Sequence, residues 1–394
     1  MLDITRISVY WTVRMCGCVA VCGSCYQIEL QLSRYHSSPR CLSLLTRILL
    51  NDRIAKMSQT VPNDDFAQAV SHLRADYQKV RDGTRLVPPA GRLVIEQSID
   101  VVGSLVYHTY WYNDGSPQGQ CIRLADIPGT LSGDILRLRQ DLPILDGDHE
   151  IVGDQIRRFE DAPKPPPLCD DTSGDLAAVL ASLPVVEVNP DKHFVKKGKY
   201  ESEIRNLLKC QGGFCPGVPI SPYIIQLLGR SSNGELVFEK FKSRYVLAFI
   251  RTLDIYKSWI LQLISGLRSL HSLGIVHRDL RIDNLLFSPD GTNILICDLE
   301  GRWGNRLAPE VSRQPVLDAG WTEKSDIYDL GHVIKGIVYG NAPITNLVEW
   351  PVPPPLNGIV EACTRELPHE RPSLEELFIM VDGINGSPTR RAAR

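Results

Sequence analysis

The chain has 394 residues, of which 43% are hydrophobic and 23% are charged, and its formal net charge is −3. This composition is typical of globular proteins, and the length allows two domains, or one two-lobed domain with an extension. So small a net charge gives no general attraction for nucleic acid or for an anionic membrane, and we expect neither as a partner. The sequence contains no run of about 18 apolar residues, so it predicts no membrane-spanning helix.

The first 56 residues carry an unusual share of the 11 cysteines. Their spacing lacks the paired CxxC and the histidines of a zinc module, so we interpret them as free thiols and expect a cytoplasmic location. Met57 follows a basic stretch and opens a more ordinary sequence. We therefore expect residues 1–56 to be disordered or foreign to the native protein. The cysteines in question are Cys16, Cys18, Cys22, Cys25 and Cys41.

Residues 58–160 predict an α+β extension of unknown role. Apolar residues recur every three or four positions between Phe66 and Val80, which predicts a helix over 58–82. From Arg92 to Ile127 the pattern becomes strand-like, with a turn at 113–115. The proline-rich run DAPKPPPLCDD follows, and we place a linker at 161–179.

Residues 180–385 predict a second α+β unit, in which strands come first and helices follow. VVEV (185–188) and HFVKK (193–197) predict a hairpin, and a helix is expected near 199–209. Two further strands are expected at 224–229 and 235–241. An apolar stripe over 256–273 then predicts an amphipathic helix, and the remainder is helix-rich up to a disordered tail at 386–394.

The strongest motif is HRDLRIDN, which runs from His277 to Asn284. The carboxylate of Asp279 is suited to accept the hydrogen bond of an attacking hydroxyl, and the amide oxygen of Asn284 is a hard ligand for Mg²⁺. Asp298 follows at the end of the apolar strand NILIC and offers a second metal ligand. This set of residue types predicts phosphoryl transfer.

Two more motifs lie downstream: Ala308-Pro309-Glu310 and KSDIYDLG at 324–331. With the earlier motif, they make residues 180–385 resemble a eukaryotic protein kinase, most closely a divergent protein of fungal type. The resemblance implies a bilobal fold, with a small β-rich N-lobe and a helical C-lobe. It also implies that Asp326 hydrogen-bonds the backbone of the catalytic loop, and that Arg371 pairs with Glu310.

The resemblance further implies a nucleotide site in the N-lobe. Lys196 is expected to hold the phosphates of ATP, with Lys197 as the alternative, and Glu203 is expected to pair with the lysine, with Glu201 as the alternative. The backbone groups of Glu239 and Phe241 are expected to contact adenine. Two departures stand out. No GxGxxG precedes Lys196, and the D-F-G motif reads Asp298-Leu299-Glu300-Gly301, so that its glycine comes one position late.

We therefore expect an ATP- and Mg²⁺-dependent protein kinase. Asp279 would act on the acceptor, and Asn284 and Asp298 would bind the metal. Arg281 stands where serine/threonine kinases usually place lysine, and a serine or threonine of a protein substrate is the favoured acceptor. The alternatives are a pseudokinase that binds nucleotide or acts as a scaffold, and a small-molecule kinase of related fold. Only nine residues separate Asp298 from Ala308, and none is Ser, Thr or Tyr.

Overall fold

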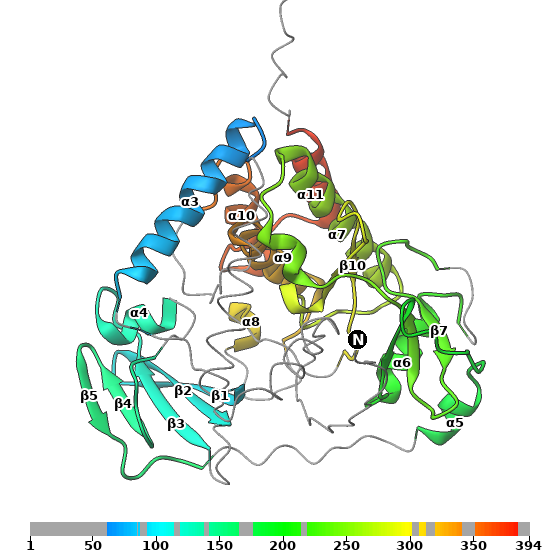
Figure 1. The fold of residues 1–394 in the computed structure, drawn as a ribbon. Coiled ribbons are helices and arrows are strands. Elements are labelled where there is room, and N and C mark those ends of the chain that lie inside the picture. The colour runs from blue at the N-terminus through cyan, green and yellow to red at the C-terminus, as the bar shows by residue number, and fades with distance from the viewer. Residues whose placement is uncertain are drawn as a thin grey trace, which may run out of the picture.

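The computed structural model of the chain describes residues 61–84, 86, 93–113, 119–137, 142–164, 176–213, 219–301, 307–312, 320–340 and 351–384. The predictions made for residues 1–56, for most of the linker and for the tail therefore lie outside the described residues. Figure 1 shows three parts: a helical region at the top, a five-stranded sheet at the lower left and a three-stranded sheet at the lower right.

The helical region is built around two long helices that cross in its centre, α7 and α9. The apolar stripe predicted for α7 is buried at Ile260, Ile264, Leu267 and Leu270. The neighbouring Trp259 is buried as well, and its indole N–H donates to the carbonyl of Gly291. Thr322 and Ser325 form a capping box that starts α9. The elements of this region are η1 (Arg244–Ala248), α7 (Leu253–Ser272), η2 (Ile282–Asn284), β9 (Leu285–Phe287), β10 (Ile294–Ile296), α8 (Pro309–Ser312), α9 (Glu323–Tyr339), α10 (Asn357–Cys363), η3 (Pro368–Glu370) and α11 (Leu374–Asp382).

The small sheet beside the helical region has the strand order β6-β8-β7, with both pairs antiparallel. Its elements are α5 (Ala177–Ala181), β6 (His193–Lys196), α6 (Glu201–Lys209), β7 (Leu227–Arg230) and β8 (Leu236–Glu239). The sheet and the helical region confirm the expected two-lobed α+β arrangement. The predicted hairpin is wrong, because Val185 forms a parallel bridge with Arg230 of β7 while β6 pairs with β8.

The five-stranded sheet has its strands in chain order, and β3 and β4 run parallel because α4 connects them. Its core is formed by Tyr110, Tyr112, Ile122 and Leu124 of the sheet together with residues of α4. The elements of this part are β1 (Leu93–Val102), β2 (Leu105–Asn113), β3 (Gln120–Ala125), α4 (Leu131–Arg137), β4 (His149–Val152) and β5 (Gln155–Arg158).

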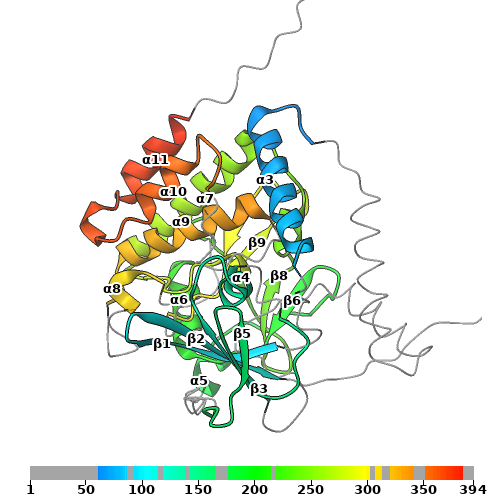
Figure 2. The same ribbon diagram turned by 90° about the vertical axis from the view of Figure 1, so that its left-hand side faces the viewer.

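Helix α3 (Asp65–Asp82) precedes this sheet in the chain but lies against α9 of the helical region (Figure 2). Its residues Phe66 and Val70 are buried in the same core as α7 and α9. The helix and the sheet of the segment 58–160 thus belong to two different hydrophobic cores. The domain boundaries of the chain stay a prediction.

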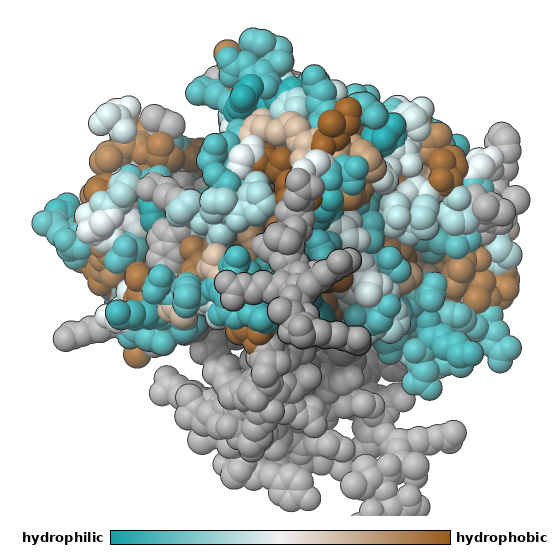
Figure 3. Space-filling model, turned by 90° about the horizontal axis from the view of Figure 1, so that it is seen from above, coloured by the Kyte–Doolittle hydropathy of each residue, from teal (hydrophilic) through white to brown (hydrophobic). Residues whose placement is uncertain are grey.

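The face of the molecule that is seen from above is of mixed polarity (Figure 3). Figure 3 shows the face seen from above, on which hydrophilic and hydrophobic residues are interspersed wherever the surface is not grey. Within the described ranges, no helix combines the length and the apolar character that crossing a membrane requires.

Candidate active site

The loop between α7 and β9 is held by a buried carboxylate from α9. Asp326 accepts hydrogen bonds from the backbone N–H groups of His277, at 2.8 Å, and Arg278, at 2.9 Å. His271 Nε2 lies 2.8 Å from the same carboxylate. This confirms the contact that the sequence implied for Asp326. Arg278 has a φ of 71°, a conformation that is costly without glycine, and the two bonds to Asp326 hold the backbone in it.

Asp279 and Asn284 lie together at the end of this loop. The Asn284 amide nitrogen donates to the backbone carbonyl of Asp279 at 2.8 Å and to its Oδ2 at 2.9 Å. Because the nitrogen is committed to these bonds, the amide oxygen is the atom left to bind a cation. Burial raises the pKa of Asp279, and Arg281, with Nε 3.6 Å from Oδ2, acts against that shift.

Lys196 lies among three carboxylates on the other side of the site. Its Nζ is 3.0 Å from Glu203 Oε1, 2.6 Å from Asp298 Oδ1 and 3.6 Å from Glu300 Oε1. The structure therefore brings Lys196, Glu203 and Asp298 together, although Asp298 is 102 residues from Lys196. The alternative Glu201 instead forms a surface pair with Arg205, and no ion pair of Lys197 occurs among the described residues.

The crowding of carboxylates shifts two pKa values. Burial raises the pKa of Glu203, an effect that Lys196 opposes. Burial and the neighbouring Asp298 raise the pKa of Glu300 to about 7. Sequence reasoning missed Glu300 as a member of this group, although its place directly after Asp298-Leu299 was the available signal.

The segment after β10 is fastened to α6. Asn206 donates to the carbonyl of Leu299 at 2.8 Å, and Ser202 donates to the carbonyl of Glu300 at 2.8 Å. The side chain of Leu299 is fully buried. Positive φ angles fall at Asp298, at 65°, and at Gly301, at 63°, so that the late glycine, and not Glu300, adopts the left-handed conformation.

The connection from β8 to the helical region is the segment predicted to contact adenine. The N–H of Lys240 donates to the carbonyl of Lys192, and Lys242 exchanges two backbone hydrogen bonds with Phe287. Between them, in the part of the chain that the structure describes, the backbone of Phe241 makes no hydrogen bond to another main-chain group. Its N–H and C=O are therefore suited to pair with a planar polar ring. Glu239 ends β8 and has an exposed side chain.

No glycine-rich turn occurs among the described residues before β6. Residues 184–186 instead run beside β7: Arg230 N–H donates to the carbonyl of Pro184, and Val186 N–H donates to the carbonyl of Arg230. Gly229 permits this close approach, since a Cβ there would lie 2.4 Å from the Pro184 oxygen. Since the strand order is β6-β8-β7, this segment lies at the edge of the sheet away from Lys196 and supplies no glycine-rich turn beside β6.

The donor set of the site suits a hard divalent cation. One ligand atom from each of Glu203, Asp298 and Glu300 lies within 4.8 Å of the others. Asn284, which is held against Asp279, adds an amide oxygen to these donor types. Carboxylate and amide oxygens are the ligands that Mg²⁺ and Ca²⁺ prefer.

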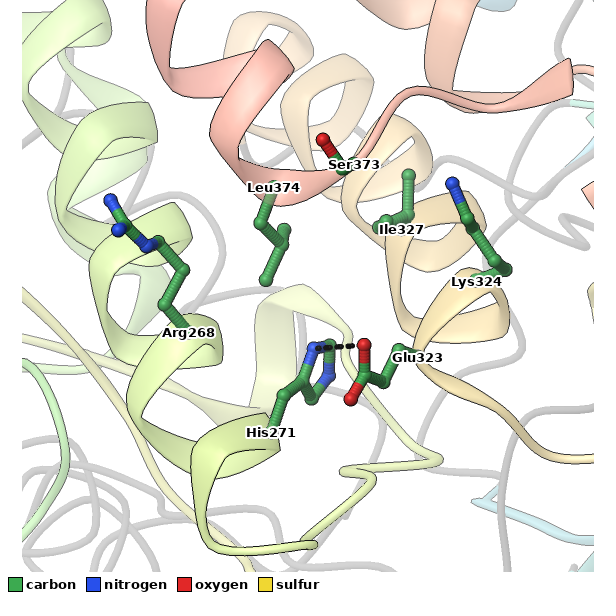
Figure 4. A pocket seen from close by; sticks show the side chains of 7 residues that line it. All are labelled: Arg268, His271, Glu323, Lys324, Ile327, Ser373 and Leu374. Atoms are coloured by element: carbon green, nitrogen blue, oxygen red, sulfur yellow. Dashed lines mark ion pairs between the residues drawn. The ribbon is translucent and has the colours of Figure 1, made fainter. Parts of the chain in front are cut away.

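A cavity of about 230 Å³ lies between α7, α9 and α11 (Figure 4). Its lining mixes both charges, including Arg268, Lys324 and Glu323. His271 Nδ1 faces Glu323 at 3.9 Å, while the other ring nitrogen binds Asp326. Asp326 therefore lies between His271, which lines the cavity, and the loop that carries Asp279 and Asn284.

An ion pair between Arg371 and Glu310 connects α8 to the segment directly before α11. The guanidinium of Arg371 is fully buried and binds both carboxylate oxygens of Glu310, at 2.7 and 2.8 Å. The same side chain donates to the carbonyls of Lys324, Arg365 and Glu366. This confirms the predicted pair.

Comparison with known proteins gives the following similarities. Residues 217–301 match the family model of the protein kinase domain. The chain is 26% identical over 192 residues to a probable LIM domain-containing serine/threonine-protein kinase of Dictyostelium discoideum. This match covers 42% of this chain and 28% of that protein. It is 27% identical over 153 residues to human (Homo sapiens) mitogen-activated protein kinase kinase kinase 7, covering 30% of this chain and 25% of the relative.

A third relative carries a different description. The chain is 28% identical over 149 residues to bradyzoite pseudokinase 1 of Toxoplasma gondii, covering 31% of this chain and 39% of the relative. In all three comparisons the chain therefore spans well under half of the relative's own length.

Proposed function

Because this chain belongs to the eukaryotic protein kinase superfamily, we propose that it transfers the γ-phosphoryl group of ATP to a hydroxyl of a protein substrate, with serine or threonine favoured. The observation that carries the proposal is the ion pair between Lys196 and Glu203, formed directly beside Asp298. A pair between a lysine on a strand and a glutamate on the following helix is what this chemistry requires for holding phosphates.

Each predicted residue has a position consistent with one task. Lys196 would hold the phosphates, and Asn284 and Asp298 would hold Mg²⁺. The backbone of Phe241, with that of Glu239, would contact adenine. When bound, the nucleotide supplies the phosphoryl group and the metal neutralises its charge.

Asp279 would orient the acceptor hydroxyl and receive its proton. Its carboxylate is fixed by the Asn284 amide, so little reorganisation is needed when a hydroxyl arrives. Burial raises the pKa of Asp279, which makes it a better proton acceptor than an exposed aspartate. Arg281 lies close enough to offset part of the negative charge.

A protein acceptor is favoured over a small molecule by the C-lobe. Ala308-Pro309-Glu310 and Asp326 correspond to elements with which kinases of the superfamily organise the peptide-binding side. Arg281 in place of lysine leaves serine or threonine as the favoured acceptor, because the surrounding residues do not otherwise resemble tyrosine kinases.

A pseudokinase is the second candidate, and one structural observation favours it. Among the described residues before β6 no glycine-rich turn is present to cover the phosphates, and Pro184 and Val186 instead run along β7, at the edge of the sheet away from β6. The similarity to a protein named a pseudokinase points the same way. In this alternative the chain binds nucleotide, or only a partner, without transferring phosphate.

The test is phosphoryl transfer from ATP to a generic protein acceptor by the purified full chain, with and without Mg²⁺. Asp279→Asn should lower the rate by about 100-fold or more and leave nucleotide affinity nearly unchanged. Asp290→Asn is the control, because Asp290 lies in the turn between β9 and β10, where its carboxylate accepts hydrogen bonds from Ser288 and Thr292. Equal rates for the wild type and Asp279→Asn, with nucleotide still bound, would leave the pseudokinase alternative in place.

A further inference from the structure

We propose that Glu203, Asp298 and Glu300 form a binding site for one divalent cation that is filled before any nucleotide binds. Glu300 is the distinguishing residue, because it occupies the position at which the D-F-G motif has glycine. The site shares Asp298 with the proposed function, but cation binding is measured without nucleotide and does not depend on phosphoryl transfer.

The geometry brings three carboxylates to one point. One ligand atom from each lies within 4.8 Å of the other two. The carboxylates come from α6 and from the segment after β10, and the bonds of Asn206 and Ser202 to Leu299 and Glu300 hold these two elements together. The arrangement is therefore built by the fold and does not depend on a single flexible side chain.

The charge of the cluster is only partly balanced. The carboxylates of Glu203, Asp298 and Glu300 all face the ammonium group of Lys196, and together they can carry more negative charge than this one group balances. Lys199, whose Nζ lies 4.7 Å from the centre of the Tyr200 ring, adds a second positive charge that acts on Glu300 and opposes the rise of its pKa. A divalent cation would balance the negative charge that remains and would favour the ionised form of all three carboxylates.

A second, independent observation points to a ligand. Glu203 is only 2% exposed, and its Oε2 has no hydrogen-bond partner, whereas its Oε1 binds Lys196 in the middle of the cluster. A buried carboxylate oxygen without a donor is unfavourable, and a metal ion would satisfy it. The unpaired oxygen thus belongs to the most buried of the three candidate ligands.

The ligand chemistry predicts a hard cation of the Mg²⁺, Mn²⁺ or Ca²⁺ type, since all three ligands are carboxylates. Lys196 and the cation compete for the same oxygens. Removal of the ammonium group should therefore tighten cation binding, whereas carboxylates that served only to hold the lysine would gain no affinity for metal.

The experiment is a titration of the nucleotide-free full chain with Mn²⁺ alone, in which the electron paramagnetic resonance signal of free Mn²⁺ reports binding. We expect one ion per chain. Glu300→Gln and Glu203→Gln should each weaken binding about tenfold or more, and Lys196→Met should strengthen it. Glu201→Gln, which changes a surface glutamate of the same helix, should leave it unchanged.

Two outcomes overturn the inference: no Mn²⁺ binding by the nucleotide-free chain, or equal binding by the wild type and Glu300→Gln. Melting temperatures measured without metal show that each variant is folded. Asp279→Asn separates this inference from the proposed function, because it should bind Mn²⁺ as the wild type does while phosphoryl transfer is lost. Normal Mn²⁺ binding with an inactive wild type would sink the kinase proposal alone.

Discussion

Arg74 of α3 donates a hydrogen bond of 2.8 Å from its Nε to the carbonyl of Val338, in the last turn of α9. The same guanidinium donates to the carbonyls of Leu247 and Ala248 at the end of η1. Carbonyls at helix ends lack partners within the helix and favour a positive charge nearby. At the start of the same segment, the Asp64 carboxylate accepts from the N–H of Leu253, the first residue of α7. Arg74 thus caps the C-terminal ends of α9 and η1, and Asp64, directly before α3, caps the N-terminal end of α7.

The first prediction concerns this capping. Arg74→Met should lower the free energy of unfolding by about 3 kcal/mol, because it leaves several half-buried carbonyls without a donor. Lys79→Met, an exposed change on the same helix, should alter it by less than about 0.5 kcal/mol. Urea denaturation of the full chain measures both. Equal effects of the two substitutions would mean that α3 is not coupled to the C-lobe.

The sequence predicted the elements whose patterns are local. The apolar stripe of α7 and the strand NILIC were readable, because periodicity and length depend only on neighbouring residues. The hairpin at 185–197 was wrong for the same reason: a turn signal says that the chain reverses, but not which strand becomes the partner. Here β8 outcompetes the local neighbour for β6.

The candidate site also shows that local sequence patterns do not predict contacts between distant segments. Asp279, Asn284 and Asp298 were predicted as site residues from fixed spacings in one motif-rich stretch. The third carboxylate on Lys196 was not found, because Glu300 reaches the lysine only when α6 packs against the segment after β10, nearly a hundred residues away. Likewise, the capping role of Arg74 depends on carbonyls 173 to 264 residues distant, which no sequence window contains.

The second prediction concerns the pair between Arg371 and Glu310. Arg371→Ala should destabilise the protein by about 3–5 kcal/mol, because it leaves the Glu310 carboxylate without its cation and strands three backbone carbonyls. Arg371→Lys keeps the charge but loses the two-pronged contact, so an intermediate loss is expected. Thermal unfolding measures both. A melting temperature unchanged in Arg371→Ala would show that the pair adds nothing to stability.

The third prediction concerns pH. Burial lowers the pKa of His332 to about 4, whereas the unfolded chain has a value near 6.5. Between pH 4 and 6.5 the unfolded state therefore binds more protons than the folded state. The contribution of His332 to the free energy of unfolding is fully present above about pH 6.5 and is lost as the pH drops toward 4. Lowering the pH from 7.5 to 5 should reduce the free energy of unfolding by about 2 kcal/mol through this group.

His332→Leu should remove that part of the pH dependence. The measurement is urea denaturation of the wild type and the variant at both pH values. His72→Leu, at an exposed position of α3, is the control and should retain the wild-type slope. A slope in His332→Leu as steep as that of the wild type would assign the acid sensitivity to other groups.

The last prediction concerns the segment from Asp298 to Glu310, which reads DLEGRWGNRLAPE. Kinases that are switched by phosphorylation order this segment when a new phosphate pairs with arginines. No residue here can accept that phosphate, and a segment so short has little conformational freedom to lose. We therefore expect activity that is independent of phosphorylation within 298–310, with control exerted elsewhere, for example by residues 58–160.

The same shortness removes the threonine that serine/threonine kinases usually place before Ala-Pro-Glu, so selectivity among peptide acceptors should be poor. The measurement compares transfer rates before and after phosphatase treatment and maps modifications by mass spectrometry. Unchanged rates are expected, with no modified residue between Asp298 and Glu310. Loss of activity on treatment, traced to a modified residue within this segment, would contradict the prediction. Loss traced to residues 58–160 would instead identify the extension as the place where the activity of the Lys196–Asp298 site is controlled.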